Sequence, residues 1–313
     1  MHEKEIIRKF FAPLANNKES YGLKNDAALI NQNIVVSTDM MVEDYHFKKN
    51  DDPEKLAQKL IRINLSDLAA MGSKPYGYVL NIAIPHSELA WIKRFSDGLK
   101  KDSKKFKLKL FGGDLSKSKK IFLSLTIFGK KKGKVHSENK AEVASDIFVT
   151  GNIGDAAIGY NLLYNHKKIN CSKSLKSYFT KKFLLPEPRI KFGQDLLGKV
   201  DFCTDVSDGL YEELLCVSEN SNLQAVIFLD SIPFSIEAKE ILKKNNKTKM
   251  LNIMLGGGED YELLFSSSKR FNNSLKINKD YIKIGYFDKG NGVKFVDSNH
   301  ENIPINIKSF SHF

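Results

Sequence analysis

The 313-residue chain is 42% hydrophobic and 27% charged, which is the balance of a folded protein and excludes a chain that is disordered throughout. Its length allows one or two hydrophobic cores, and typical domain sizes favour two. No apolar run approaches the roughly 20 residues that a membrane helix needs, and residues 1–11 predict a short amphipathic helix rather than a signal peptide.

The formal net charge of +12 raises the question of nucleic-acid binding. The lysines fall in short runs such as Lys130–Lys132, which are typical of solvated loops, and no stacking aromatic residues alternate with them. We therefore expect no nucleic-acid partner, although anionic small molecules would gain from the same charge. The three cysteines (Cys171, Cys203 and Cys216) lack metal-binding spacing and fit a reducing cytoplasm.

The first half of the chain predicts alternating strands and helices. Apolar and β-branched runs predict strands at Ile34–Thr38, Tyr78–Ile84, Leu108–Phe111 and Ile121–Phe128. A helix is expected to begin at Pro53, because Asp51 and Asp52 supply an N-terminal cap, and to end near Gly72. Ser87 is expected to cap a second helix.

A polar, lysine-rich stretch over residues 130–140 predicts a domain boundary, so we expect domains over residues 1–138 and 139–313. The second half predicts strands at Asp146–Thr150, Val200–Thr204, Ala225–Leu229, Tyr261–Phe265, Tyr281–Tyr286 and Val293–Val296. Helices are expected from Asp155 and from Gly209. This mixed alternation predicts a layered α/β or α+β fold.

Acidic residues stand beside Gly, Ser or Ala at the ends of apolar elements. They are Asp26, Asp39, Asp67, Asp114, Asp205, Asp208, Glu259 and Asp260. Burying an unpaired carboxylate is strongly unfavourable, so such groups are paired, capped or bound to metal. Each one alone could be an ordinary helix cap or turn residue. Together they indicate a Mg²⁺ site, because Mg²⁺ prefers hard oxygen ligands and also binds substrate phosphates.

Asp67 is the most informative of these residues, because it lies inside a predicted helix among apolar and small side chains. The one nearby cation in the sequence, Arg62, falls on another side of that helix. Two glycine-rich segments, Gly112–Asp114 and Gly256–Gly258, could let a phosphate approach the backbone or could be tight turns. The segment Gly193–Lys199 is nearly a Walker loop, but it lacks the final Ser or Thr and predicts a helix instead.

Several segments resemble thiamine-monophosphate kinase, a family of the aminoimidazole ribonucleotide synthetase-like superfamily. They are Asn25–Ala28, Ser37–Glu43 with His46–Phe47, Asn64–Gly72, Gly112–Asp114, Val149–Gly151, Asp205–Leu210, Gly257–Leu263 and His312–Phe313. They span almost the whole chain in order. The resemblance implies a two-domain α/β (α+β) fold, in which an N-terminal mixed sheet with helices pairs in a homodimer and a C-terminal α/β sandwich domain follows.

The resemblance also implies a function: ATP-dependent phosphorylation of thiamine monophosphate to thiamine diphosphate, by direct transfer without a nucleophilic side chain. The implied magnesium ligands are Asp26, Ser37, Thr38, Asp39, Asp67, Asp114, Asp205 and Asp208. The implied nucleotide contacts are Gly113, Asp114 and Ser207, and the implied substrate contacts are His46, Glu259 and Phe310. The site would lie between the two domains of a cytoplasmic enzyme.

The chain departs from the family pattern at two positions. Asn25 replaces the first carboxylate of an Asp-Asp pair, and Glu138 stands where the family has a nucleotide-binding arginine. Lys134 or Lys140 could supply that charge, although without the bidentate geometry of arginine.

Two other functions remain open at this point. One is a related ATP-using enzyme acting on a purine-pathway amidine or on selenide. The absence of a cysteine near the N-terminus argues against selenide, and His46 with Ser311–Phe313 argues against the amidine. The other is a basic binding protein without catalytic activity.

Overall fold

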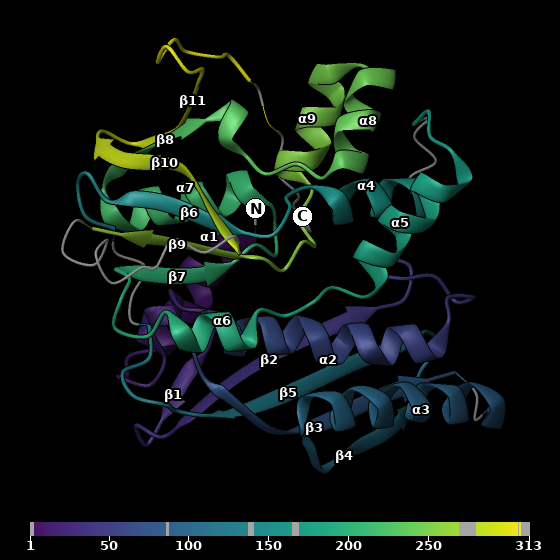
Figure 1. Cartoon of the computed structure of the whole chain (residues 1–313). Helices are drawn as coiled ribbons and strands as arrows, with labels where there is room; N and C mark the ends of the chain where they lie inside the picture. The colour runs from purple at the N-terminus through teal and green to yellow at the C-terminus, as the bar shows by residue number, and fades with distance from the viewer. Residues whose placement is uncertain are drawn as a thin grey trace.

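The computed structural model describes residues 3–85, 88–136, 141–164, 169–268, 280–305 and 307. Two sheets, one from each half of the sequence, form the lower and upper parts of the molecule, and helix α2 (Pro53–Ala70) crosses between them (Figure 1). This mixed α/β arrangement confirms the predicted fold class. In the part of the chain that the structure describes, no helix is both long and apolar enough to cross a bilayer.

The lower sheet has five strands in the order β1-β2-β5-β3-β4. Their bounds are Ala28–Ile30 (β1), Ile34–Val42 (β2), Lys74–Ile84 (β3), Lys109–Lys117 (β4) and Phe122–Lys130 (β5). Neighbouring strands are antiparallel except β3 and β4. Leu123, Leu125 and Ile127 of β5 are buried, whereas the residues between them are only half-buried. One face of the sheet is therefore covered, chiefly by α2, and the other is open.

Two strands of this sheet run further than the sequence predicts. β2 continues to Val42, and Asp39 pairs with Leu125 in mid-strand instead of closing the strand. β4 continues to Lys117, and Asp114 pairs with Asn81. The predicted strand ends were wrong because both carboxylates are tolerated within a strand. Asp114 points to the open face of the sheet, and Asp39 points to the covered face, where it lines a cavity beside α2.

Helix α2 begins and ends as predicted. The Asp52 carboxylate accepts a hydrogen bond from the Glu54 backbone N–H at 3.0 Å, and Pro53 is the first helical residue. Arg62 points away from Asp67, as expected, and its Nε lies 2.6 Å from Oδ2 of Asp102 on α3 (Leu89–Phe106). The N-cap of α3 is Glu88, not Ser87 as predicted; Ser87 itself lies outside the described residues.

The upper sheet has six strands in the order β11-β8-β10-β6-β9-β7. Their bounds are Asp146–Thr150 (β6), Phe202–Asp205 (β7), Leu223–Phe228 (β8), Leu263–Ser267 (β9), Tyr281–Lys289 (β10) and Gly292–Val296 (β11). The helices around it are α4 (Asp155–Leu163), α5 (Lys173–Leu184), α6 (Ile190–Asp195), α7 (Leu210–Ser221), α8 (Ile236–Lys244) and α9 (Lys247–Gly256). All six predicted strands and both predicted helices are present, and α6 confirms that the Walker-like segment is helical.

The two halves meet where α6 and β7 pack against α2. A Cβ atom on Gly193 of α6 would lie 1.9 Å from the carbonyl oxygen of Ala69, so only glycine permits this close approach of the two helices. The same packing brings the end of β7, with Asp205, to the face of α2 that carries Asp67.

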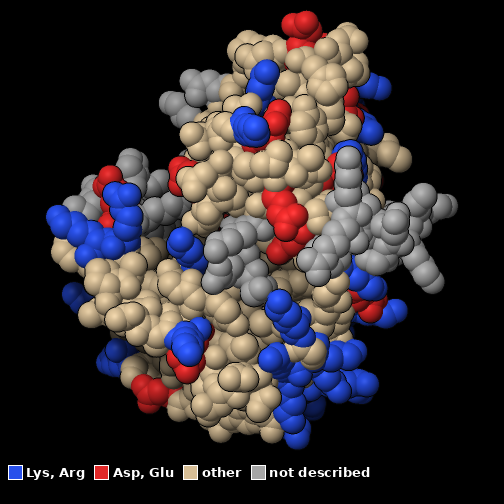
Figure 2. Space-filling view, turned by 90° about the vertical axis from the view of Figure 1, so that its left-hand side faces the viewer, with Lys and Arg blue, Asp and Glu red and all other residues tan. Residues whose placement is uncertain are grey.

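The N-terminal segment continues as α1 (Glu3–Ile6) and a short π-helix (Ile7–Phe11). The helix predicted there is present, but Phe10 and Phe11 are each 53% exposed in this single chain. Lys and Arg side chains gather in the lower part of the face shown in Figure 2, which is the part formed by the N-terminal sheet and its helices in Figure 1.

Candidate active site

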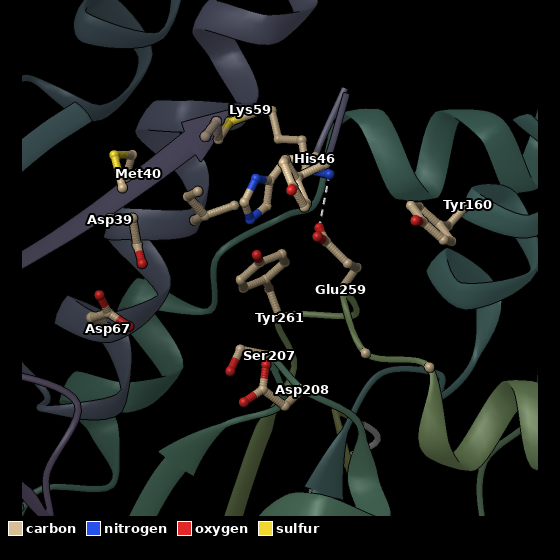
Figure 3. A pocket seen from close by; sticks show the side chains of 15 residues that line it. Asp39, Met40, His46, Lys59, Asp67, Tyr160, Ser207, Asp208, Glu259 and Tyr261 are labelled. Carbon is tan, nitrogen blue, oxygen red and sulfur yellow. Dashed lines mark ion pairs between the residues drawn. The ribbon is translucent and has the colours of Figure 1, made fainter. Parts of the chain in front are cut away.

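A cavity of about 310 Å³ lies between the two halves, bounded by β2, α2, the loop after β7 and the turn before β9 (Figure 3). Six of the polar side chains singled out from the sequence line it: Asp39, His46, Asp67, Ser207, Asp208 and Glu259. They come from both halves of the chain, so folding brings them together as the resemblance implies.

The carboxylates of Asp26, Asp67 and Asp205 form one cluster with Asp39 at one end of the cavity, called the acidic end below. Ser37 Oγ donates to Asp67 Oδ2 at 2.6 Å and also lies 3.0 Å from the carbonyl oxygen of Asp26. Thr204 Oγ1, one residue before Asp205, donates to Asp26 Oδ1 at 2.8 Å. These bonds join the loop before β1, β2, α2 and β7, which fixes the cluster at the junction of the two halves.

The cluster is electrostatically unfavourable without bound cations. Burial, reinforced by the charge of Asp205, raises the pKa of Asp26 to about 8 and that of Asp39 to about 7. Burial and the nearby Asp208 raise the pKa of Asp205 to about 6. Burial and the charges of Asp39, Asp205 and Asp26 raise the pKa of Asp67 well above its usual value. Repulsion of this kind is relieved when a divalent cation binds between the carboxylates.

The donor set fits Mg²⁺. Asp205 Oδ2 is buried and has no hydrogen-bond partner among the described residues, which leaves it available to an ion. Within the described ranges, no three His, Cys, Asp or Glu side chains are arranged closely enough to hold an ion by themselves. Mg²⁺ sites commonly combine one or two carboxylates with water and substrate phosphates, so the ligand set would be completed by a bound nucleotide.

Three sequence-predicted residues lie away from the cavity. Thr38 points to the opposite face of β2, where its Oγ1 donates to the Leu125 carbonyl at 3.2 Å. Asp114 is exposed on the edge strand β4, and it accepts a hydrogen bond from Ser116 Oγ at 3.1 Å. Gly113, next to it, meets a structural requirement, because a Cβ there would lie 1.8 Å from the Leu80 carbonyl. Phe310, Glu138 and Lys140 lie outside the described residues, as do residues 311–313.

His46 and Glu259 line the opposite end of the cavity, called the substrate end below after the contacts that the resemblance implies. His46 Nδ1 accepts a hydrogen bond from the Val42 backbone N–H at 3.0 Å. Glu259 lies in a tight turn, and its backbone N–H donates to the Ser207 carbonyl at 2.7 Å. Gly258, with φ of +50°, has no room for a side chain because a Cβ would lie 2.2 Å from that same carbonyl. Gly256 is the last residue of α9, and Gly257 and Gly258 begin a tight turn that borders the cavity.

Several lining residues were not identified from the sequence. Lys59, Tyr160 and Tyr261 contribute an ammonium group and two aromatic rings to the cavity. Lys59 carried a usable signal, because it stands four residues before Ile63 and eight before Asp67 and therefore shares their helix face.

Glu213 lies close to the cavity residue Asp208: its Oε1 accepts a hydrogen bond from the Asp208 backbone N–H at 3.1 Å. Asp208 does not cap α7, whose N-cap is Gly209.

The fold is that of the AIR synthase-related class of proteins. The family model "AIR synthase related protein, N-terminal domain" matches residues 24–130. The solved structure "AaThiL complexed with AMPPCP and TMP" superposes with a TM-score of 0.85 at 27% identity, covering 100% of this chain and 99% of that one.

Relatives that match this chain over nearly its full length identify the family within that class. The thiamine-monophosphate kinase of Buchnera aphidicola subsp. Schizaphis graminum is 38% identical, covering 100% of this chain and 99% of its own. That of Haemophilus influenzae is 32% identical, covering 100% and 98%. The chain belongs to the thiamine-monophosphate kinase family.

The stability of the magnesium-free protein is expected to fall as the pH rises from 6 to 8. Asp26, with a folded pKa of about 8, and Asp39, with a pKa of about 7, keep protons that the unfolded chain has already lost at its usual value of 3.8. The folded state therefore binds more protons, and its free energy of unfolding decreases with pH. Urea denaturation in EDTA at pH 6, 7 and 8 measures this change.

With saturating Mg²⁺, the free energy of unfolding is expected to fall less between pH 6 and pH 8, because the bound ion replaces the protons on the carboxylates. Asp39→Asn should also make the decrease smaller, since one titrating group is lost. If the free energy of unfolding stays constant over this pH range in EDTA, the carboxylates of the cluster do not have the raised pKa values described above.

Proposed function

We propose that this chain transfers the γ-phosphate of ATP directly to thiamine monophosphate and so forms thiamine diphosphate. One observation carries the proposal: the cluster around Asp67 and the substrate-end residue Glu259 share one cavity, in a member of the thiamine-monophosphate kinase family. A structural neighbour at 27% identity is described as complexed with AMPPCP and TMP, which supports the same pair of ligands here.

The reaction brings two anionic phosphates together, so its main requirement is charge neutralisation and in-line placement. Asp26, Ser37, Asp39, Asp67, Asp205 and Asp208 would hold Mg²⁺, with Thr38 and Asp114 as further proposed ligands. Bound Mg²⁺ would supply the positive charge that lowers the repulsion between the phosphates. Ser207 and Gly113 would contact the nucleotide, and His46, Glu259 and Phe310 would orient thiamine monophosphate. No side chain acts as a nucleophile.

We propose that the active form is a homodimer in which the open faces of the two lower sheets pair. The open face carries apolar side chains such as Met40, which is 55% exposed, and Phe122, which is 38% exposed. Asp114 pairs with Asn81, which pairs with Ser124, so it lies on the same face as Ser124. Sheet pairing would place Asp114 inside the assembly. We further propose domains over residues 1–138 and 139–313 and a cytoplasmic location.

The proposed function is tested by incubating the purified protein with ATP, Mg²⁺ and thiamine monophosphate and separating the products by chromatography. We expect thiamine diphosphate and ADP in equal amounts, and neither product when EDTA is present. ATP consumption that does not depend on thiamine monophosphate, or that requires an amidine or selenide instead, would contradict the proposal.

Gly258→Ala is expected to raise the KM for thiamine monophosphate by roughly 10- to 100-fold, because a small displacement of a positioning residue has large kinetic effects. The new Cβ would lie 2.2 Å from the Ser207 carbonyl, so the turn must move and Glu259 must move with it. Steady-state kinetics with each substrate measure the change. Gly198→Ala is the matched control, because Gly198 also has positive φ but has no atom within 4 Å of the added Cβ. Equal effects of the two variants would show that backbone strain alone is responsible.

A further inference from the structure

One face of α2 carries both ends of the cavity. Lys59, Ile63 and Asp67 are spaced four residues apart and all line it. Eight helical residues separate Lys59 from Asp67, which corresponds to a rise of about 12 Å along the axis. Asp67 joins the acidic cluster, whereas Lys59 reaches the turn that holds Glu259 (Figure 3). This single helix thus sets the distance between the acidic end and the substrate end of the cavity.

Lys59 is an unusual residue for such a place, because its side chain is only 2% exposed. Its Nζ lies 2.7 Å from Glu259 Oε2 and 3.4 Å from the centroid of the Phe183 ring. A carboxylate and the face of an aromatic ring are both favourable neighbours for a buried ammonium group. The two contacts join α2 to the turn before β9 and to α5, and so connect the two halves of the chain at the substrate end.

The Glu259 carboxylate is buried on one side only. Oε2, which faces Lys59, is buried, yet the side chain as a whole is 25% exposed. A carboxylate has acceptor positions for several partners, so a contact with Lys59 leaves others for a ligand in the cavity. A glutamate that is free to rotate loses side-chain entropy when it binds a ligand, and this loss weakens binding. The ion pair with Lys59 already restricts the Glu259 side chain before the substrate binds, so less entropy is lost at that step.

The surroundings of Glu259 suit a flat cation. Tyr160 and Tyr261 line the same cavity, and the charge of Glu259 is among the causes that, after burial, raise the pKa of each of these tyrosines. An anionic group between aromatic rings is the chemistry that recognises a positively charged heteroaromatic ring. Thiamine monophosphate carries such a ring in its thiazolium.

We propose that Lys59 is a positioning residue that fixes Glu259 so that its free carboxylate positions and the neighbouring tyrosine rings receive the cationic ring of thiamine monophosphate. This inference rests on the proposed function. It assigns Lys59 to substrate binding through Glu259 and gives it no contact with the ATP phosphates.

Lys59→Met, which keeps an unbranched side chain only one atom shorter and removes its charge, is expected to raise the KM for thiamine monophosphate roughly tenfold, the effect of losing one charged interaction. The KM for ATP should stay within about twofold, and kcat should change less than the KM for thiamine monophosphate. Lys55→Met is the matched control: the same substitution one turn earlier on α2, at an exposed position, should change neither constant.

A double-mutant cycle separates positioning from a merely structural role. If Lys59 acts through Glu259, then Lys59→Met in a Glu259→Gln background should cause no further rise in the KM for thiamine monophosphate. Equal, additive effects in both backgrounds, or parallel rises in both KM values, would overturn the inference. Lys59→Gln provides the same cycle if the Met variant does not fold. Wild-type turnover is measured first, so a failure of the proposed function is seen independently of any variant.

Discussion

Asp67→Asn is expected to lower kcat by roughly 10²- to 10³-fold, the loss that follows removal of one preorganised electrostatic contact to a transition state. Three carboxylates, those of Asp39, Asp205 and Asp26, repel Asp67, and its Oδ2 accepts a hydrogen bond from Ser37 Oγ at 2.6 Å. The amide keeps the shape of the side chain but provides no negative charge for Mg²⁺. Turnover at saturating ATP, Mg²⁺ and thiamine monophosphate measures the effect.

The same substitution is expected to leave the fold intact and to stabilise the magnesium-free protein, because it removes one charge from a cluster of like charges. Thermal denaturation in EDTA checks this expectation. Asp97→Asn on the exposed side of α3 is the matched control and should change neither turnover nor stability. Near-normal turnover of Asp67→Asn would remove the metal cluster from the mechanism.

Arg62→Met is expected to lower the free energy of unfolding by about 3–5 kcal/mol, the usual consequence of breaking a buried ion pair from one side. Asp102, its partner on α3, is only 1% exposed and would keep the Gln58 amide at 2.7 Å but no cation. Arg62 Nη1 also donates to the Pro186 carbonyl at 3.1 Å, so a contact between the two halves is lost as well. Urea denaturation followed by fluorescence and by circular dichroism measures the change.

Arg94→Met provides the control for this prediction. Arg94 also makes an arginine–aspartate pair, with Asp52 at 2.7 Å, but its side chain is 55% exposed. Exposed pairs contribute about 0–1 kcal/mol, so the expected loss is several times smaller. Comparable losses in the two variants would mean that burial of the Arg62 pair is not what makes it important.

Much of the fold follows from local sequence signals. The bounds of β6 and the start of α4 are as predicted, and α2 begins at the Asp52–Pro53 cap. These elements were predictable because capping and apolar periodicity act over a few residues. β2 and β4 were predicted too short, because only pairing with neighbouring strands shows that Asp39 and Asp114 continue the ladder.

The candidate site was partly predictable for a similar reason. Carboxylates such as Asp67 and Asp205 stand out because a charge inside or at the end of an apolar element needs a partner. Tyr160 does not stand out, because tyrosine is ordinary on helices and only the packing of the two halves turns it toward the cavity. Lys59 can be found from the sequence only once Asp67 is taken as a site residue, because the two share one face of α2. The placement of Asp114 on an edge strand depends on strand order, which sequence patterns do not specify.

The contact between Gly193 and Ala69 limits how far amino-acid substitutions can change the spacing between the two halves of the chain. The main chains of α6 and α2 touch there without an intervening side chain, so the gap between the halves is set by backbone thickness. Exchanging the apolar residues around this contact would change how tightly the halves hold together but would leave the width of the gap nearly the same. Relatives with other substrate preferences would therefore differ mainly in the turns and helix ends at the rim of the cavity.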